Sequence, residues 1–269
     1  MTALTRNNVS VTGTGEVALV FIHGFGCDQR MWRLVAPAFE DRYRVVLLDL
    51  VGAGGSEVGA YDPARYAALQ AHADDVLAVV RALALPRVVL VGHSVSAMIA
   101  VLAAIAAPAG IVERLVLVAP SPRYLNDAGY VGGFERVDIE ELLEAMDANY
   151  LGWSGAMAPV IMGHPEQPAL AQELTDSFCR TDPAIARHFA RVTFLGDNRG
   201  DLPRLHTPTL ILQSAHDVIA PLPVGQYLHR QLPGSELVVL DTSGHCPHLS
   251  APAPTIAAID HFLGAAPRP

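Results

Sequence analysis

Leu90-Val91-Gly92-His93-Ser94-Val95-Ser96 is the stretch of this sequence that decides the fold. An apolar run at 88–91 leads into the glycine, and a long apolar segment begins at Ala97. A buried strand, a sharp turn and a helix in this order raise a serine hydroxyl above the end of a parallel sheet. The helix then points its N–H groups at any anion formed there. The pattern therefore predicts that Ser94 is the nucleophile of a hydrolase.

One position departs from the common G-x-S-x-G form of this motif, because Ser96 stands where the second glycine is expected. A G-x-S-x-S segment alone is weak evidence, and a plain turn would explain it equally well. Ser96 could tune the polarity around the nucleophile, or it could be a small residue tolerated where the helix packs close to the sheet. The departure leaves Ser94 in place and puts the tightness of the turn, and hence the catalytic rate, in question.

Apolar runs and helix-like segments alternate along the first 120 residues. Continuous apolar runs are typical of strands buried on both faces of a parallel sheet, and apolar residues at helical spacing are typical of the crossovers between them. The expected strands are 17–23, 44–49, 88–91 and 115–119, and the expected helices are 31–39, 65–83 and 97–107. This order predicts an α/β fold, an open, mostly parallel sheet with helices on both faces.

The alternation ends after Pro120. Residues 121–200 show no convincing buried strand, and their amphipathic stretches are 138–150, 154–162, 168–179 and 183–194. Strand signals return at 209–213 and 236–240, with helices near 224–231 and 253–263. A helical block inserted in such a sheet would lie above the carboxyl ends of the strands, where ligands bind. We therefore expect a core, 1–120 and 201–269, and a helical cap, 121–200, inserted after the sixth strand.

An activated serine needs a general base, and the base needs an acid that orients it. In α/β-hydrolases the chain order is serine, acid, histidine. Asp217 follows the expected strand 209–213, and His245 follows the last expected strand. Each has a structural alternative, since aspartate often caps turns and a lone histidine is more often structural. The histidines that compete with His245 are His93, His216 and His248. Agreement of order, spacing and context favours the triad Ser94, Asp217 and His245.

A second motif, His23-Gly24-Phe25-Gly26, follows the first expected strand. In hydrolases of this chain order a backbone N–H from that loop faces the nucleophile, and glycine lets the chain approach the substrate closely. We predict that the backbone N–H groups of Phe25 and Val95 receive the oxyanion. A simple strand-to-helix turn would explain both glycines, but it would not explain their match to the hydrolase order.

The signals for cofactors and metals are weak. Residues 52–57 place Glu57 at the third glycine position of a dinucleotide fingerprint, and no P-loop G-K-[ST] follows. His245, Cys246 and His248 are close in sequence, but Pro247 and the lack of a paired ligand cluster disfavour a metal site. The sequence therefore predicts neither a cofactor nor a metal.

Composition limits the class of protein further. The 269 residues are 51% hydrophobic and 17% charged, with a formal net charge of −9, which favours a packed globular protein and disfavours nucleic-acid binding. Three widely spaced cysteines, Cys27, Cys179 and Cys246, indicate reduced thiols in the cytoplasm. The N-terminus lacks a signal-peptide core, and the apolar segment 97–112 is shorter than the roughly 20 residues of a membrane span. We expect a cytoplasmic protein outside the membrane.

Stretches along nearly the whole sequence resemble RsbQ-like hydrolases, which are bacterial stress-response regulators, and the plant strigolactone and karrikin receptor hydrolases. The stretches are 23–29 with Trp32, 49–54, 92–95, 120–127, 132–134, 149–153, 181–183 and 244–249. The resemblance implies four cap helices over an apolar pocket with the triad at its floor. The pocket-lining residues it implies are Phe25, Val95, Phe134, Trp153, Met157 and Phe194. For any one aromatic residue, a place in the core of the cap is an equal alternative.

The resemblance also implies an activity and a partner. Such hydrolases cleave small apolar esters or butenolide-like lactones, and in RsbQ-like systems the hydrolase works with a phosphatase that carries a sensor domain. We therefore expect a serine hydrolase that cleaves a small apolar ester or lactone through an acyl-enzyme. The alternative is a signalling module whose cap engages a regulatory protein after ligand binding, with slow hydrolysis. A lyase that uses the same triad is a third reading.

Overall fold

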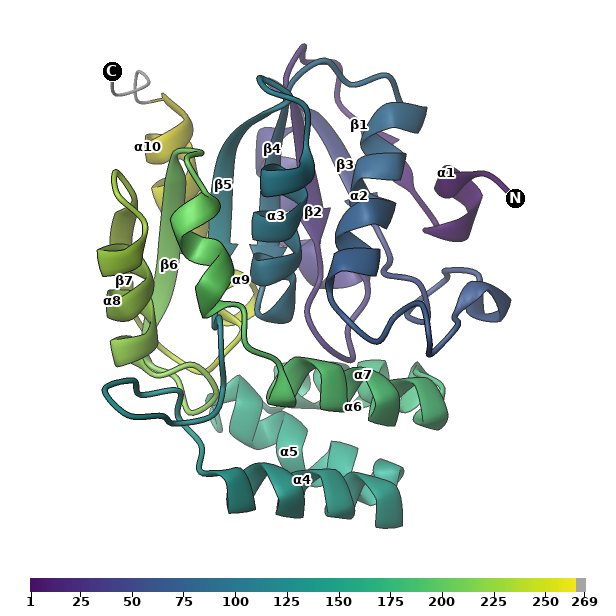
Figure 1. The fold of residues 1–269 in the computed structure, drawn as a ribbon, viewed down its shortest axis with the longest axis vertical. Helices are drawn as coiled ribbons and strands as arrows, with labels where there is room; N and C mark the ends of the chain where they lie inside the picture. Colours follow the sequence, from purple (N-terminus) through teal and green to yellow (C-terminus); the bar gives the residue numbers. More distant parts are fainter. Residues whose placement is uncertain (265–269) are drawn as a thin grey trace.

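A single sheet forms the centre of the computed structural model, which describes residues 1–264 (Figure 1). Its seven described strands have the order β1-β3-β2-β4-β5-β6-β7. They are β1 Ser10–Thr12, β2 Ala18–Ile22, β3 Arg44–Leu48, β4 Val88–His93, β5 Val112–Val118, β6 Thr209–His216 and β7 Glu236–Ser243. Strand β1 pairs antiparallel with β3, and all the other pairs are parallel. The predicted α/β fold with a mostly parallel sheet is therefore confirmed.

Helices cover both faces of the sheet. One face packs against α2 (Gln70–Ala82), α3 (Val95–Ala106) and α8 (Leu222–Gln231), and the other packs against α10 (Pro252–Gly264) and two 3₁₀ helices. Successive side chains of a strand point to opposite faces, so Leu90 joins the first layer and Val91 the second. Both layers are apolar, which explains why the strands read as continuous apolar runs. The remaining short helices are α1 Ala3–Arg6, η3 Val58–Ala60, η4 Arg199–Arg204 and α9 Pro247–Ser250.

The helix expected at 31–39 is wrong. The chain forms two 3₁₀ helices there, η1 (Gln29–Trp32) and η2 (Ala36–Phe39). Proline lacks a backbone N–H, and inside an α-helix its ring clashes with the preceding turn. Pro37 therefore prevents a continuous helix, and it lies instead in the first turn of η2. Residues 65–69 likewise precede α2, which begins only at Gln70.

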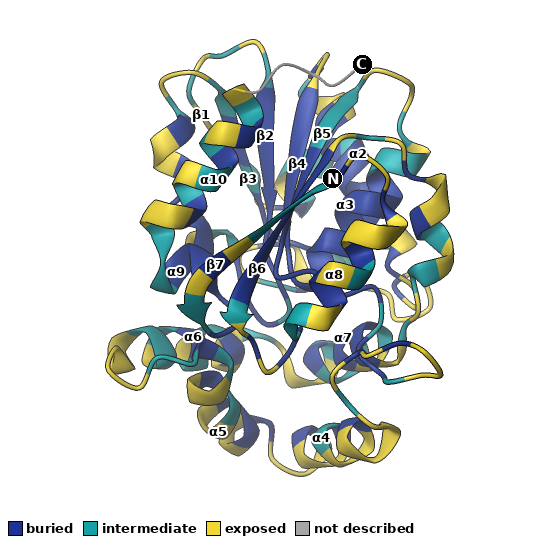
Figure 2. Cartoon of the chain, turned by 90° about the vertical axis from the view of Figure 1, so that its left-hand side faces the viewer, coloured by how far each residue is buried: buried dark blue, intermediate teal, exposed yellow. Residues whose placement is uncertain are grey.

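Four helices inserted between β5 and β6 form a cap over the carboxyl ends of the parallel strands (Figures 1 and 2). They are α4 Arg136–Ala148, α5 Tyr150–Met162, α6 Pro168–Arg180 and α7 Pro183–Leu195. Five strands, β1 to β5, precede the cap in the described part of the chain. The cap therefore follows the fifth strand, and the expected position after a sixth strand is corrected. Figure 2 shows buried strands above a cap whose outer surfaces are exposed.

Capping residues explain where two of these helices begin. The side chain of Asn149 accepts a hydrogen bond from the backbone N–H of Gly152 at the start of α5. Asp182 does the same for two N–H groups at the start of α7, where Pro183 follows as the first helical residue. These groups satisfy N–H donors that a helix start otherwise leaves unpaired. Among the described helices, none combines the length and hydrophobicity needed to cross a membrane.

His72 is a buried histidine within the layer formed by α2. Its ring centroid lies 4.6 Å from that of Tyr66 and 5.0 Å from that of Phe189 in α7. Neither ring nitrogen has a hydrogen-bond partner among the described residues. Burial, with smaller contributions from His23, Arg65 and His188, lowers the pKa of His72 to about 3. The folded protein therefore holds this histidine neutral where an unfolded chain protonates it, below about pH 6.5.

This pKa shift predicts a loss of stability in acid. Between about pH 6.5 and 3 the unfolded chain binds a proton at residue 72 that the folded chain does not, so the free energy of unfolding falls with pH by about 1.4 kcal/mol per unit. Between pH 7.5 and 5.0, His72→Phe should therefore lose about 2 kcal/mol less than the parent in urea denaturation. The exposed histidine variant His206→Gln is the control and should follow the parent. An equal loss in His72→Phe would contradict the assignment.

Candidate active site

Ser94 lies at a sharp turn between the end of β4 and the start of α3. Its backbone angles are φ 57° and ψ −124°, a region that residues other than glycine rarely adopt. The backbone N–H of Ser94 donates to the carbonyl of Val118 on β5 at 2.8 Å. A Cβ atom at Gly92 would lie 2.2 Å from the carbonyl oxygen of Ser96, so only glycine fits there. The turn is therefore formed although residue 96 is not glycine.

The three predicted triad residues meet at the carboxyl ends of three strands. His245 Nε2 lies 2.7 Å from Ser94 Oγ, and His245 Nδ1 lies 2.7 Å from Asp217 Oδ2. Asp217 follows β6, and its Oδ1 accepts hydrogen bonds from the backbone N–H groups of Ile219 and Ala220. With the carboxylate accepting from Nδ1–H, Nε2 is free to accept the Ser94 proton. All three residues are buried.

Contacts on both sides hold the loop that carries His245. The backbone N–H of His245 donates to the carbonyl of Ile161 in cap helix α5 at 2.8 Å. On the other side, His93 Nε2 donates to the carbonyl oxygen of His245, also at 2.8 Å. Gly244 has φ 81°, and a Cβ atom there would overlap the carbonyl oxygen of Met162. The core and the cap therefore fix the position of this histidine together.

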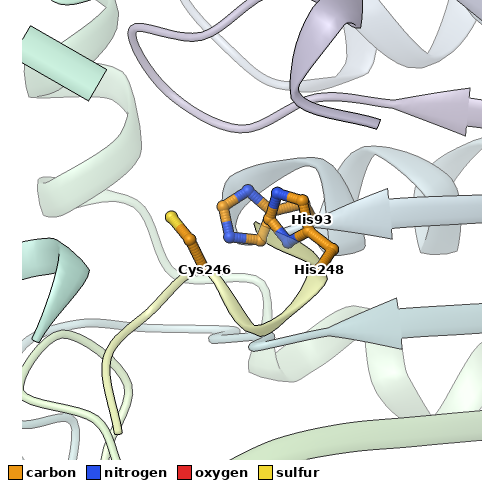
Figure 3. Close-up of side chains that lie close together, drawn as sticks. All are labelled: His93, Cys246 and His248. Carbon is orange, nitrogen blue, oxygen red and sulfur yellow. The ribbon is translucent and has the colours of Figure 1, made fainter. Parts of the chain in front are cut away.

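His93, Cys246 and His248 form a buried cluster beside this loop (Figure 3). Their nearest possible ligand atoms lie within 4.8 Å of one another. His93 already uses Nε2 for the hydrogen bond described above, and a Cβ atom at Gly24 would lie 2.5 Å from its Nδ1. The His248 ring packs 4.6 Å from Trp32 and 4.4 Å from His93 between centroids.

Burial determines the charge of this cluster. It lowers the pKa of His248 to about 3 and holds that of His93 well below its usual value. It also raises the pKa of the Cys246 thiol. The three side chains are therefore neutral at pH 7, and the ring contacts give both histidines a packing role beside the loop that carries His245. The absence of a metal stays a prediction.

The loop 23–26 lies directly against Ser94. A Cβ atom at Gly24 would lie 3.3 Å from the Cβ of Ser94, so glycine allows this close approach. The backbone N–H of Val95 is among the first of α3, which have no acceptor within the helix. Within residues 1–264, neither this N–H nor that of Phe25 donates to a backbone carbonyl outside regular helix and strand pairing. Val95 follows the serine directly, and Phe25 follows the glycine that packs against it, so both predicted oxyanion-hole donors belong to residues adjacent to this contact.

An apolar pocket under the cap reaches Ser94 and His245. The aromatic residues that line it are Phe25, Tyr124, Trp153, Phe178 and Phe194, and Met157 lies among its aliphatic neighbours. Of the six residues expected to line the pocket, four do so: Phe25, Trp153, Met157 and Phe194.

Phe134 and Val95 are not among the lining residues, which corrects the expectation for both. Phe134 is held in a short backbone bridge with Leu125, and its half-buried side chain packs at the edge of the core. The side chain of Val95 is buried in the layer formed by α2 and α3. Only its backbone N–H, and not its side chain, can serve the site.

Tyr124 is a site residue that the motifs do not single out. Its hydroxyl oxygen lies 3.2 Å from Ser94 Oγ, and its ring packs 5.2 Å from that of Phe194. Burial raises the pKa of Tyr124 above its usual value, so the hydroxyl stays neutral and can donate a hydrogen bond. The only sequence feature that pointed to Tyr124 was its place in the stretch 120–127, which resembles the related hydrolases. That resemblance did not assign the residue a role.

Comparison with known proteins identifies the family of the chain. The model of the Alpha/beta hydrolase family matches residues 19–258. The chain belongs to this family, and it is a hydrolase. A strigolactone esterase of Arabidopsis thaliana is 43% identical over 247 residues, which cover 91% of this chain and 92% of that protein. A karrikin insensitive 2 receptor of Petunia hybrida is 41% identical over 247 residues, with 91% of each chain covered. The predicted resemblance to these plant hydrolases is confirmed.

The arrangement of the whole chain is also shared with a solved structure. A hydrolase from Oleispira antarctica superposes with a TM-score of 0.95 at 40% sequence identity, covering 98% of this chain and 97% of the other. The cap lies inside the matched region, so the likeness extends beyond the sheet.

The close packing at the turn predicts that Gly92→Ala destabilises the protein. The added methyl group meets the backbone carbonyl of Ser96, and overpacking of this kind costs about 1–3 kcal/mol. Gly155→Ala is the matched control, because Gly155 is exposed within α5 and its Cβ would meet nothing within 4 Å. That variant should gain about 0.5–1 kcal/mol from helix propensity. Thermal unfolding of both measures the difference, and equal melting temperatures would count against a tight turn.

Proposed function

We propose that this protein hydrolyses a small apolar ester or lactone with Ser94 as nucleophile, His245 as general base and Asp217 as the orienting acid. The observation that carries the proposal is the continuous pair of 2.7 Å hydrogen bonds from Asp217 through His245 to Ser94, at the floor of an apolar pocket. Nucleophile, base and orienting acid within hydrogen-bond reach of one another are the signature of nucleophilic catalysis by serine.

The reaction begins when Ser94 Oγ attacks the carbonyl carbon of the bound ester. His245 Nε2 takes the hydroxyl proton, and Asp217 stabilises the imidazolium that forms. The backbone N–H groups of Phe25 and Val95 donate to the developing oxyanion, and each such donor is worth about 3 kcal/mol. His245 then returns the proton to the leaving oxygen as the carbon–oxygen bond breaks. Water, activated by the same histidine, cleaves the acyl-enzyme and restores Ser94.

The lining of the pocket supports a small and uncharged substrate. Aromatic and aliphatic side chains cover most of it, and the polar groups gather at the floor around Ser94, as in sites where a few polar groups orient an apolar ligand. The strigolactone esterase among the relatives supports an ester or lactone as the reacting group. In this proposal the core, residues 1–120 and 201–269, supplies the chemistry, and the cap, residues 121–200, supplies most of the pocket wall.

A receptor role is the second candidate, favoured by the 41% identity to a karrikin insensitive 2 receptor. In that case the cap would engage a regulatory protein after ligand binding, and turnover would be slow. Rapid multiple turnover of many equivalents of ester, with no ligand-dependent change in the mobility of the cap, favours the plain enzyme. A single slow turnover accompanied by altered hydrogen exchange in α4–α7 favours the receptor.

Ser94→Ala should abolish hydrolysis of p-nitrophenyl acetate, because Ser94 carries the hydroxyl that His245 Nε2 contacts at 2.7 Å and can deprotonate. The matched control is Ser154→Ala, which removes a buried serine whose hydroxyl donates to the Tyr150 carbonyl within α5. This control should keep its activity within a few-fold. Circular dichroism checks that both variants fold. Turnover that persists in a folded Ser94→Ala protein would rule out the proposed nucleophile.

Asp217→Asn should reduce kcat by about 10⁴-fold, because an amide NH₂ facing His245 favours the imidazole tautomer that cannot accept the Ser94 proton. The Asn oxygen can still accept the hydrogen bonds from Ile219 and Ala220, so the loop should keep its shape. Steady-state kinetics with p-nitrophenyl acetate gives kcat, and the melting temperature serves as the control. A folded variant with near-parental kcat would show that Asp217 does not orient the base.

A further inference from the structure

Ser96, which stands where the common motif has glycine, makes a specific contact in the structure. Its side chain is completely buried, and its hydroxyl donates to the backbone carbonyl of His23 at 2.5 Å. Ser96 is in the first turn of α3, and His23 is the first residue after β2. This hydrogen bond therefore joins α3, which begins directly after Ser94, to the 23–26 loop, which packs against Ser94.

These two elements carry the two N–H groups that the proposed mechanism uses. Val95, the residue before Ser96, supplies one, and Phe25, two residues after His23, supplies the other. An oxyanion must reach both donors at 2.7–3.1 Å, so their separation has to be fixed before the reaction begins. The hydrogen bond from Ser96 to His23 spans the two segments close to both donors.

The imidazole of His23 also fixes the next peptide group along the chain, the one between Gly24 and Phe25. Its Nε2 accepts the backbone N–H of Leu50 at 3.0 Å, so Nδ1 holds the proton and donates to the Gly24 carbonyl at 2.9 Å. The Cys27 N–H donates to the same carbonyl at 3.3 Å.

The Gly24 carbonyl and the Phe25 N–H belong to one peptide group. This group is planar and trans, so its C=O and N–H point in opposite directions. Fixing the carbonyl from His23 and Cys27 therefore fixes where the Phe25 N–H points. Ser96 holds the peptide group immediately before this one.

We propose that Ser96 is a positioning residue whose hydroxyl sets the spacing of the Phe25 and Val95 N–H groups. The inference rests on the proposed function, since it concerns the oxyanion hole of that mechanism. A glycine at position 96 would leave the turn at Ser94 possible and would remove this link. Loss of the link lets the 23–25 loop move relative to α3, and shifts of about 0.5 Å are enough to impair a preorganised site.

The test compares Ser96→Ala and Ser96→Gly with the parent. A boronic acid with a small apolar substituent is the probe, because it forms a tetrahedral adduct with the serine and places an oxygen in the oxyanion hole. In both variants we expect kcat for p-nitrophenyl acetate and the affinity for the boronic acid to fall together by about tenfold. KM and the affinity for an ether analogue of the ester, which has no carbonyl, should stay within twofold.

Thr209→Val is the matched control. Thr209 is a buried residue at the amino end of β6, whereas the pocket lies at the carboxyl ends of the strands. Its hydroxyl donates to the Thr207 carbonyl at 2.8 Å. This variant also loses one buried hydroxyl-to-carbonyl hydrogen bond, so it should lose comparable stability without any change in kcat or boronic acid affinity. Ser96→Cys is a second variant of similar size with a weak donor, and it should fall between the parent and Ser96→Ala.

Two results would overturn the inference. The first is a folded Ser96→Ala protein that keeps both kcat and boronic acid affinity within twofold of the parent. The second is an equal loss of affinity for the boronic acid and for the ether analogue, which would indicate a general disturbance of the pocket. Failure of the proposed function itself has a different signature, namely turnover that persists in Ser94→Ala.

Discussion

The backbone conformation of Ser94 is the constraint on which the rest of the site depends. A residue other than glycine at φ 57° and ψ −124° costs about 1–3 kcal/mol, and it persists only where its surroundings enforce it. Here the surroundings are β4 in the middle of the sheet, the hydrogen bond to Val118 and the contact between Gly92 and the carbonyl of Ser96. Burial of both sheet faces supplies the stability that offsets this local cost, and the strain leaves the hydroxyl facing the pocket.

Parallel pairing explains why distant segments can serve this serine. The chain leaves β2, β4, β6 and β7 at the same edge of the sheet, so the 23–26 loop, Asp217 and His245 arrive there without long excursions. The cap covers the pocket and also makes a direct contact with the loop that carries His245. The carbonyl of Ile161 in cap helix α5 accepts a hydrogen bond from the His245 N–H, so the position of His245 depends on the insertion as well as on the core. A change in the cap that moves Ile161 would therefore also move His245 relative to Ser94.

The meeting of Ser94, Asp217 and His245 in one place could be predicted from the sequence, because their order and their places after apolar runs follow from the topology of a parallel sheet. Side-chain directions within the cap could not. Phe134 was expected in the pocket but is held in a bridge beside Leu125, while Tyr124, ten residues earlier, reaches the serine. The partner of Ser96 was equally hidden, because its acceptor lies 73 positions away and only the fold brings them together. The short strand β1 could not be predicted either, because it is defined by its pairing with β3 and not by a local pattern. The number of strands before the cap was therefore uncertain from the sequence.

The central claim is that Ser94 alone becomes covalently acylated. Incubating the protein with a fluorophosphonate probe and mapping the modified peptides by mass spectrometry tests this claim most directly. The account predicts one adduct per chain, on the peptide that contains Ser94. It also predicts none on Cys27 or Cys246, which line the same pocket with thiols whose pKa values burial raises. An adduct on either cysteine or on His245, or an unmodified Ser94 in a preparation that the probe has inactivated, would contradict it.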